Sequence, residues 1–223
     1  IKGSVSRLSG FFDTDLAFEG TGLRLDIPEA DRLLAGRSTL TASIRRDEGG
    51  STLRSFDLAA GGLVAKGSGT LSSTRSDLTG SVSLADLAAL GPQYSGALDL
   101  AGRFTGAPDD GRLQLTGSGQ SLRIGNPEAD KLLAGRSLLE LDLAIKDGVI
   151  QIREGRLVNP QLSATVQGEI AGAVRKLVLE ARLANLGLIV PEVSGPLQVT
   201  GTASQDDSGY QLDITGNGPG QIA

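Results

Sequence analysis

Three glycine-rich triplets and two acidic pairs are the residues of this chain whose type and spacing could do chemistry. Backbone N–H groups of glycine loops can cradle phosphate, and paired carboxylates can exchange protons or bind calcium. The triplets lack the continuation of a phosphate-binding loop and the acids lack calcium-loop spacing, so we predict bulge or turn glycines and solvated hairpin turns. The triplets are Gly67-Ser68-Gly69, Gly117-Ser118-Gly119 and Gly216-Asn217-Gly218, and the pairs are Asp109-Asp110 and Asp206-Asp207.

Composition excludes much of the remaining chemistry. The 223 residues include no His and no Cys, which removes the usual zinc ligands and the imidazole of a Ser-His-Asp triad. A net charge of −5 with two Tyr and five Phe argues against nucleic acid binding. We therefore expect no catalytic, cofactor or metal site, and an enzyme on an all-β scaffold is the least favoured hypothesis.

An internal repeat organises the chain. The segment 28–38 recurs at 127–137 with a single change, from Arg32 to Lys131, and the same offset of 99 residues aligns Leu98, Leu100 and Gly102 with Leu197, Val199 and Gly201. We assign repeat copies to about 1–97 and 98–196, with a partial third copy at 197–223. Because no linker separates them, we expect one continuous structural segment over 1–223.

Alternating apolar and polar residues dominate each copy, as in 139–145 and 177–183. This period of two is typical of β-strands with one apolar face, and Asp110-Gly111 and Asp147-Gly148 are expected hairpin turns. Segment 28–35 has Pro first, acids next and a Gly after it, which predicts a two-turn amphipathic helix. A second helical turn is expected within 84–90.

The predicted fold class is therefore all-β with short helices, as an elongated, curled antiparallel sheet built from tandem repeats of about 99 residues. We expect six to eight strands in each copy, and a sheet of this kind must either cover its apolar face with a second layer or leave an apolar trough. Ordinary core burial and a lipid-lined trough use the same leucines, so both interpretations stay open at this point.

The segments 84–92, 95–106 and 113–119 resemble the TamB family, which is related to AsmA-like, bridge-like lipid transfer proteins. They combine a Leu-Ala-Asp-Leu turn with Gly-x-Leu-x-Leu-x-Gly strands, and the likeness extends over essentially the whole chain. The resemblance implies a β-taco or half-pipe groove in the periplasm of a Gram-negative bacterium. It also implies conduction of phospholipids between the inner and outer membranes, with support of outer-membrane protein assembly and envelope biogenesis.

The same resemblance implies partners. These are phospholipid acyl chains and a TamA-like outer-membrane barrel, the latter contacted through parts of the parent protein outside this segment. An inner-membrane anchor is expected in the parent and is not seen here, since no apolar run reaches the 18 residues of a membrane span. The chain starts at Ile1 without a visible signal peptide, and we interpret it as an internal fragment of a longer protein.

Candidate lining residues of the groove follow from the alternation and the repeat. The alternative function is a structural or adhesive β-repeat of a secreted or cell-surface protein, in which the same residues would form a self-filled core. The candidates are Leu23, Leu25, Leu58, Leu63, Leu98, Leu100, Leu113, Leu115, Leu122, Ile124, Leu139, Leu141, Leu143, Ile145, Leu157, Leu162, Leu197, Val199, Leu212 and Ile214.

Overall fold

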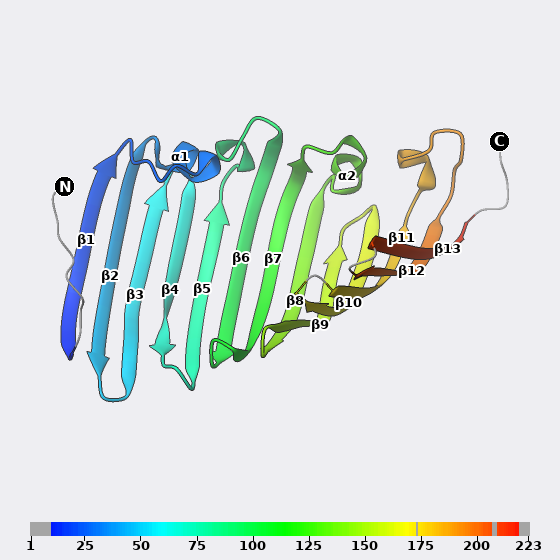
Figure 1. Ribbon diagram of the computed structural model, residues 1–223. Helices are drawn as coiled ribbons and strands as arrows, with labels where there is room; N and C mark the ends of the chain where they lie inside the picture. Colours follow the sequence, from blue (N-terminus) through cyan, green and yellow to red (C-terminus); the bar gives the residue numbers. More distant parts are fainter. Residues whose placement is uncertain (1–9, 173, 207–208, 219–223) are drawn as a thin grey trace.

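The computed structural model describes residues 10–172, 174–206 and 209–218. They form one open antiparallel sheet of 13 strands, in which each strand pairs with its neighbours in chain order (Figure 1). This confirms the predicted fold class. The strands are β1 (Phe12–Thr21), β2 (Arg37–Asp47), β3 (Gly50–Ala60), β4 (Leu63–Leu71), β5 (Ser76–Leu84), β6 (Tyr94–Gly106), β7 (Asp110–Ile124), β8 (Arg136–Lys146), β9 (Val149–Val158), β10 (Leu162–Ala171), β11 (Val174–Leu183), β12 (Leu197–Asp206) and β13 (Gly209–Asn217).

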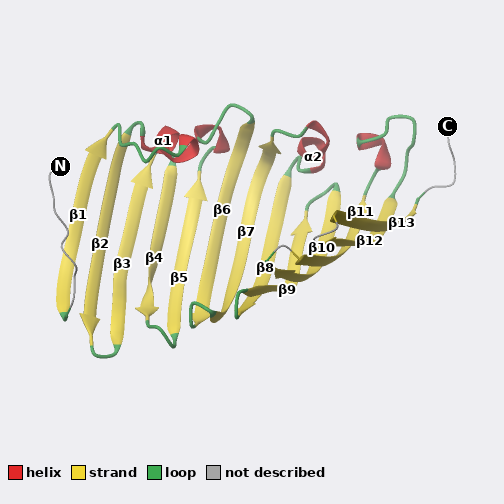
Figure 2. Cartoon of the chain, in the orientation of Figure 1, coloured by secondary structure: helices red, strands yellow, loops and turns green. Residues whose placement is uncertain are grey.

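The elements repeat at the spacing seen in the sequence. Strands β2 and β8 begin and end 99 residues apart, and the helices α1 (Pro28–Leu34) and α2 (Pro127–Leu132) begin at the same offset. Strands β1–β6 form the first unit and β7–β12 the second, and each unit contains one α-helix and one 3₁₀ turn. Strand β13 occupies the first place of a further unit, as β1 and β7 do in theirs. Figure 2 shows that all the helical pieces lie at one end of the strands.

The helical pieces pack on one face of the sheet and form a small core there. Leu33 of α1, Leu84 of β5 and Leu87 are buried together, with Leu63 and Leu98 packed against them. The second helical turn spans only Leu87–Ala89 (η1), because Leu84 still belongs to β5. Asp86 accepts a hydrogen bond from the backbone N–H of Ala88 at 2.9 Å and so caps this turn. The second unit has the corresponding turn at Leu186–Leu188 (η2).

At the end of the strands away from the helical pieces, the described connections are short. Asp147-Gly148 forms the turn between β8 and β9, with both residues at positive φ. The prediction for Asp110-Gly111 was wrong, because the β6–β7 turn spans 107–109 and both residues already belong to β7. Asp110 closes the turn by exchanging two backbone hydrogen bonds with Ala107, and Gly111 pairs with Gly106 in the next rung.

Candidate functional site

Strand register gives the sheet two chemically different faces. Residues directly opposite each other on antiparallel strands point to the same side. We call the side that carries Leu58, Leu100 and Leu141 the apolar face, and the other side the polar face. One row of directly paired residues crosses the apolar face from β1 to β13; it consists of Leu16, Ala42, Phe56, Gly67, Gly80, Gly102, Leu115, Leu141, Gly155, Val166, Leu179, Gly201 and Ile214.

The register places every candidate lining residue on the apolar face except Leu23 and Leu25. These two lie in the connection between β1 and α1, where their backbone N–H groups bond to Leu34 and Asp31. Their counterparts 99 residues later, Leu122 and Ile124, do belong to a strand, because β7 has 15 residues and β1 only 10. The residues on the apolar face are Leu58, Leu63, Leu98, Leu100, Leu113, Leu115, Leu122, Ile124, Leu139, Leu141, Leu143, Ile145, Leu157, Leu162, Leu197, Val199, Leu212 and Ile214.

Sequence reasoning missed the aromatic residues of this face. Phe18 pairs with Leu40, Phe56 with Ala42 and Gly67, and Phe104 with Leu78 and Leu113. All three therefore lie on the apolar face. The signal was present, because Phe56 precedes the candidate Leu58 by two residues and Phe104 follows Leu100 by four. Even spacing keeps a strand residue on the same side, so extending the alternation by one step would have found Phe56 and by two steps Phe104.

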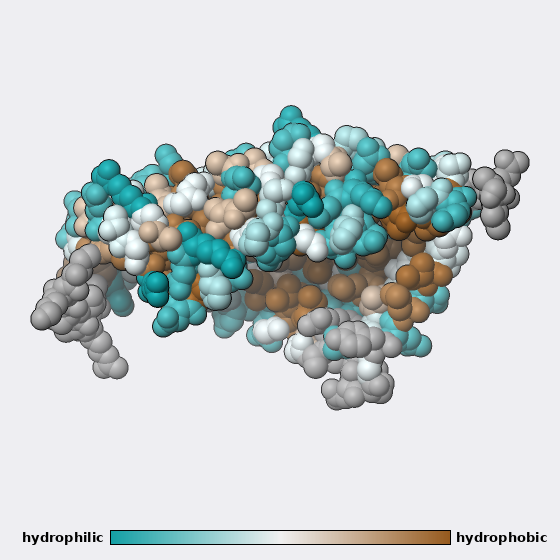
Figure 3. All heavy atoms as spheres, turned by 90° about the horizontal axis from the view of Figure 1, so that it is seen from above, coloured by the Kyte–Doolittle hydropathy of each residue, from teal (hydrophilic) through white to brown (hydrophobic). Residues whose placement is uncertain are grey.

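The apolar face is largely uncovered. Among the described residues only Leu33, Ala42, Ala60, Leu84, Leu87 and Leu183 are buried hydrophobics, and most of them lie near the helical end. The leucines farther along the strands are half-buried, and Leu212 of β13 is 66% exposed. Figure 3 shows the hydrophobic residues gathered in the hollow of the curved sheet. The described residues thus provide one layer and place no second layer over this face.

The apolar face also lacks charge over most of its length. From β3 to β10 the strand residues on this face include no Asp, Glu, Lys or Arg. The phenol of Tyr94 and a few serines, such as Ser76 and Ser137, are the polar groups that these strands place there, and both serines are buried near the strand ends. A molecule in contact with the middle of this face therefore meets hydrocarbon alone.

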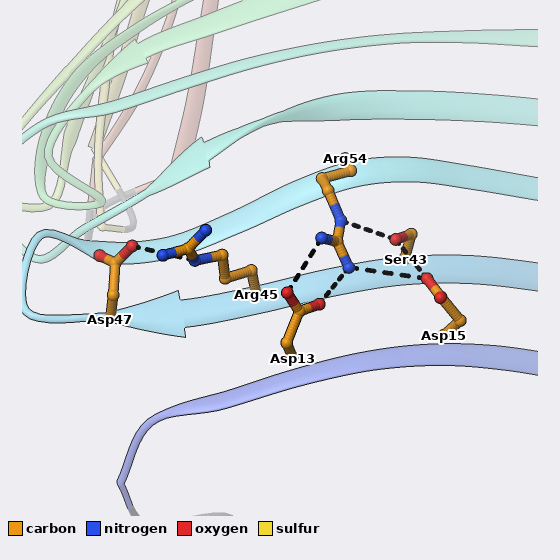
Figure 4. Close-up of polar contacts among 6 residues, drawn as sticks. All are labelled: Asp13, Asp15, Ser43, Arg45, Asp47 and Arg54. Carbon is orange, nitrogen blue, oxygen red and sulfur yellow. Dashed lines mark hydrogen bonds and ion pairs between the residues drawn. The ribbon is translucent and has the colours of Figure 1, made fainter.

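The polar face carries the charges, arranged as ion pairs between strands. Arg54 of β3 reaches across β2 to Asp13 and Asp15 of β1, and its Nε donates to Ser43 Oγ at 2.8 Å (Figure 4). Hydrogen bonding to Asp13 is the main cause that raises the pKa of Arg54. Such pairs connect strands across the polar face, on the side opposite the leucine rows.

Two further pairs repeat this arrangement. Arg103 donates to Asp77 at 2.8 and 2.6 Å through Nε and Nη2, and Arg112 donates from Nε to Asp142 at 2.8 Å. Hydrogen bonds from these guanidinium groups are the main cause that lowers the pKa of Asp77 and of Asp142 below the ordinary value for Asp. These carboxylates are held ionised, which suits an ion pair and does not suit a proton donor at neutral pH.

The glycine triplets and acidic pairs form no reactive site among the described residues. Gly67-Ser68-Gly69 and Gly117-Ser118-Gly119 lie inside β4 and β7, and Gly216 and Asn217 are the last two residues of β13, so these three elements present no loop before a helix. Asp109 lies in a turn, whereas Asp207 is outside the described residues. The part of the chain that the structure describes contains no group of three or more potential metal ligands, and none of its helices could span a bilayer.

Comparisons with known proteins add no relative. No family model, no curated protein and no solved structure matches this chain.

Proposed function

We propose that this chain is a periplasmic section of a TamB-like lipid conduit, in which the apolar face holds phospholipid acyl chains as they move between the inner and outer membranes. The observation that carries the proposal is the largely uncovered apolar face, which is uncharged on the described residues of β3 to β10 and extends across neighbouring strands. The resemblance found in the sequence supplies the periplasmic setting, the contribution to outer-membrane protein assembly and envelope biogenesis, a TamA-like barrel partner and an inner-membrane anchor in the parent protein.

The dimensions of the sheet support this proposal. Thirteen strands at about 4.8 Å spacing give an apolar strip about 60 Å long, measured across the strands. Each CH₂ group that leaves water gains about 0.8 kcal/mol, and a chain that slides from one leucine row to the next keeps that gain. Such movement needs a continuous lining and no reactive group, and both properties describe this face.

The alternative, a structural or adhesive repeat with a self-filled core, requires the leucines to be buried by the protein itself. Within the described residues most of them stay half-buried or exposed, so the observed burial favours the conduit. Large apolar patches of this extent on a protein surface mark binding sites for apolar partners.

Binding of phospholipid to a charge variant tests the proposal. Leu141→Asp puts a carboxylate in the middle of the apolar face, where losing its hydration costs several kcal/mol, so bound phospholipid should fall about tenfold or more. The matched control is Leu138→Asp on the same strand, because Leu138 is 47% exposed on the polar face. Native mass spectrometry of the purified chain with phosphatidylglycerol gives the occupancy, and circular dichroism checks the β content.

Two results would contradict the conduit. The wild-type chain could emerge bare at all lipid concentrations, or Leu141→Asp could retain as much phospholipid as Leu138→Asp. A transport assay in the intact parent protein provides a second test, in which Leu143→Asp should stop lipid flux while the protein stays folded.

A further inference from the structure

A distinct hollow interrupts the apolar face in the first repeat unit. It has a volume of about 440 Å³, and side chains from β3 to β7 line it, among them Phe56, Leu78, Leu100, Phe104 and Leu115. Volumes of about 300–1,000 Å³ are typical of small-molecule sites. The hollow lies in the uncharged part of the face. Lys66, Ser68 and Thr79 border it, but the register turns their side chains to the polar side.

Gly80 of β5 lines this hollow, and Gly67 of β4 stands between Gly80 and Phe56, two of its lining residues. Gly67 of β4 and Gly80 of β5 lie directly opposite each other, and only backbone atoms come within 4 Å of the place where a Cβ would stand on either residue. The other glycines on this face with ordinary φ values each have an apolar side chain within that distance. These covered glycines are Gly20, Gly102, Gly111, Gly117, Gly119, Gly155, Gly201 and Gly216.

The second repeat unit fills the equivalent place. Val166 and Leu179 stand 99 residues after Gly67 and Gly80, and they pair with each other in the same way on β10 and β11. The two units share their strands and register at this position and differ in their side chains. Besides the two glycines, the lining residues Phe56 and Phe104 are also replaced, by Gly155 and Ala203. At the paired glycines the first unit therefore leaves open a place where the second unit carries two apolar side chains.

The chemistry of the hollow determines what fits it. An occupant with a charge in the recess would lose its hydration and find no partner, since the apolar face carries no ionised side chain on β3 to β10. The recess continues at both sides into the leucine rows, which suits a long flexible chain better than a compact ligand. A hydrocarbon tail has the required shape and lacks charge.

We propose that the recess over Gly67 and Gly80 is a discrete binding site for one lipid acyl chain, a position where a chain rests longer than elsewhere on the apolar face. This inference rests on the proposed function and deepens it. In the second unit Val166 and Leu179 leave a shallower surface, so a chain there makes fewer contacts and moves on sooner.

Photolabelling of the full chain tests this site. The probe is a palmitic acid analogue with a diazirine at its tail end, and mass spectrometry of the labelled peptides locates it. In the wild-type chain, label should concentrate on β3–β7. The double variant Gly67→Val with Gly80→Leu installs the residues of the second unit and should lower that label about tenfold, while label on β9–β12 stays unchanged.

The matched control is Ser68→Val with Thr79→Val. These residues lie on the same two strands and pair with each other, but they face the polar side. Both double variants add β-branched or large apolar residues to strands, which tolerate them well, and circular dichroism verifies that each folds.

Each outcome separates the two proposals. Label that is spread evenly along the apolar face and insensitive to Gly67→Val with Gly80→Leu overturns the binding site but leaves the conduit in place. Absence of label from the whole face overturns both. Equal loss of label in the Ser68→Val, Thr79→Val control also overturns the binding site. So does a wild-type dimer that the Gly67→Val, Gly80→Leu variant converts to monomer, because the occupant would then be a second copy of the chain.

Discussion

At the scale of residues, both repeat units carry ion pairs on the polar face, but residues at different positions form them. Asp13 and Arg112 occupy equivalent positions in the two units, and so do Ser43 and Asp142. In the first unit Asp13 accepts a hydrogen bond from Arg54, whereas in the second unit Arg112 donates a hydrogen bond to Asp142. Both units thus place an ion pair in this part of the polar face, formed by residues on different strands.

Acid should remove the contribution of the Arg112–Asp142 pair. The pKa of Asp142 is lowered, first by the hydrogen bond from Arg112, so the pair stabilises the fold above the unfolded-state pKa of about 3.9 and loses its effect as pH falls through the lower folded value. Asp142→Asn should therefore unfold at lower urea concentration than wild type at pH 7, with the difference vanishing in strong acid. Asp109→Asn, an exposed turn residue, is the control, and a difference that persists unchanged into strong acid would contradict the assignment.

At the scale of elements, glycines at positive φ accompany the β-bulges. Gly69 pairs with the residue that precedes the bulge of β3, and Gly168, 99 residues later, holds the same place beside the bulge of β9; their φ angles are 141° and 148°. A Cβ on either residue would collide with a carbonyl oxygen of the next strand, from Asp77 or Lys176. The repeat thus preserves a bulge and the glycine that permits it, and bulges of this kind bend a sheet.

Replacing Gly69 should lower the free energy of unfolding more than replacing another glycine that also has a positive φ. Gly69→Ala combines unfavourable φ with a backbone collision, so its free energy of unfolding should fall by clearly more than the cost of about 1–2 kcal/mol for a left-handed residue. Gly62→Ala has positive φ and no atom within 4 Å of the added Cβ, and it should show only that cost. Urea denaturation measures both, and equal losses would show that the bulge tolerates a side chain.

Most elements could be predicted from the sequence, because alternation and repetition are local properties. The helix at 28–35 was predicted to within one residue of its end, since Pro28 and Gly36 are direct signals for its start and stop. Bulge or turn glycines were predicted at Gly67-Ser68-Gly69, but the place of the extra residue, on β3 opposite Ser68, depends on pairing between strands. The open face and the recess over Gly67 and Gly80 depend on which side chains lean over which glycines, and spacing along the chain does not contain that information.

At the scale of the whole molecule, each strand contacts its immediate neighbours and the sheet lacks a single central core. Stability should then be close to a sum of local terms, as in repeat proteins. Only the helical end of each unit adds packing, and the two units differ there: Leu33 is buried, whereas its counterpart Leu132 is half-buried.

Leu33→Ala should consequently loosen only part of the sheet. Removing this buried side chain should cost about 2–4 kcal/mol locally, so amide hydrogen exchange should accelerate in β2–β6 and stay at the wild-type rate in β10–β12. Leu132→Ala provides the comparison and should produce a smaller effect, confined to the second unit. Uniform acceleration along all strands in Leu33→Ala would instead show that the sheet unfolds as one cooperative body.

Strand order identical to chain order has a consequence for how the protein forms. Every strand finds its partner in the residues that immediately precede it, so a chain emerging from a ribosome or a secretion channel can add rungs one at a time, without waiting for distant segments. Low contact order of this type is associated with rapid folding among small domains. Growth by zipping would also allow evolution to lengthen the protein by duplicating a unit, because a new copy extends the sheet and disturbs no existing pairing.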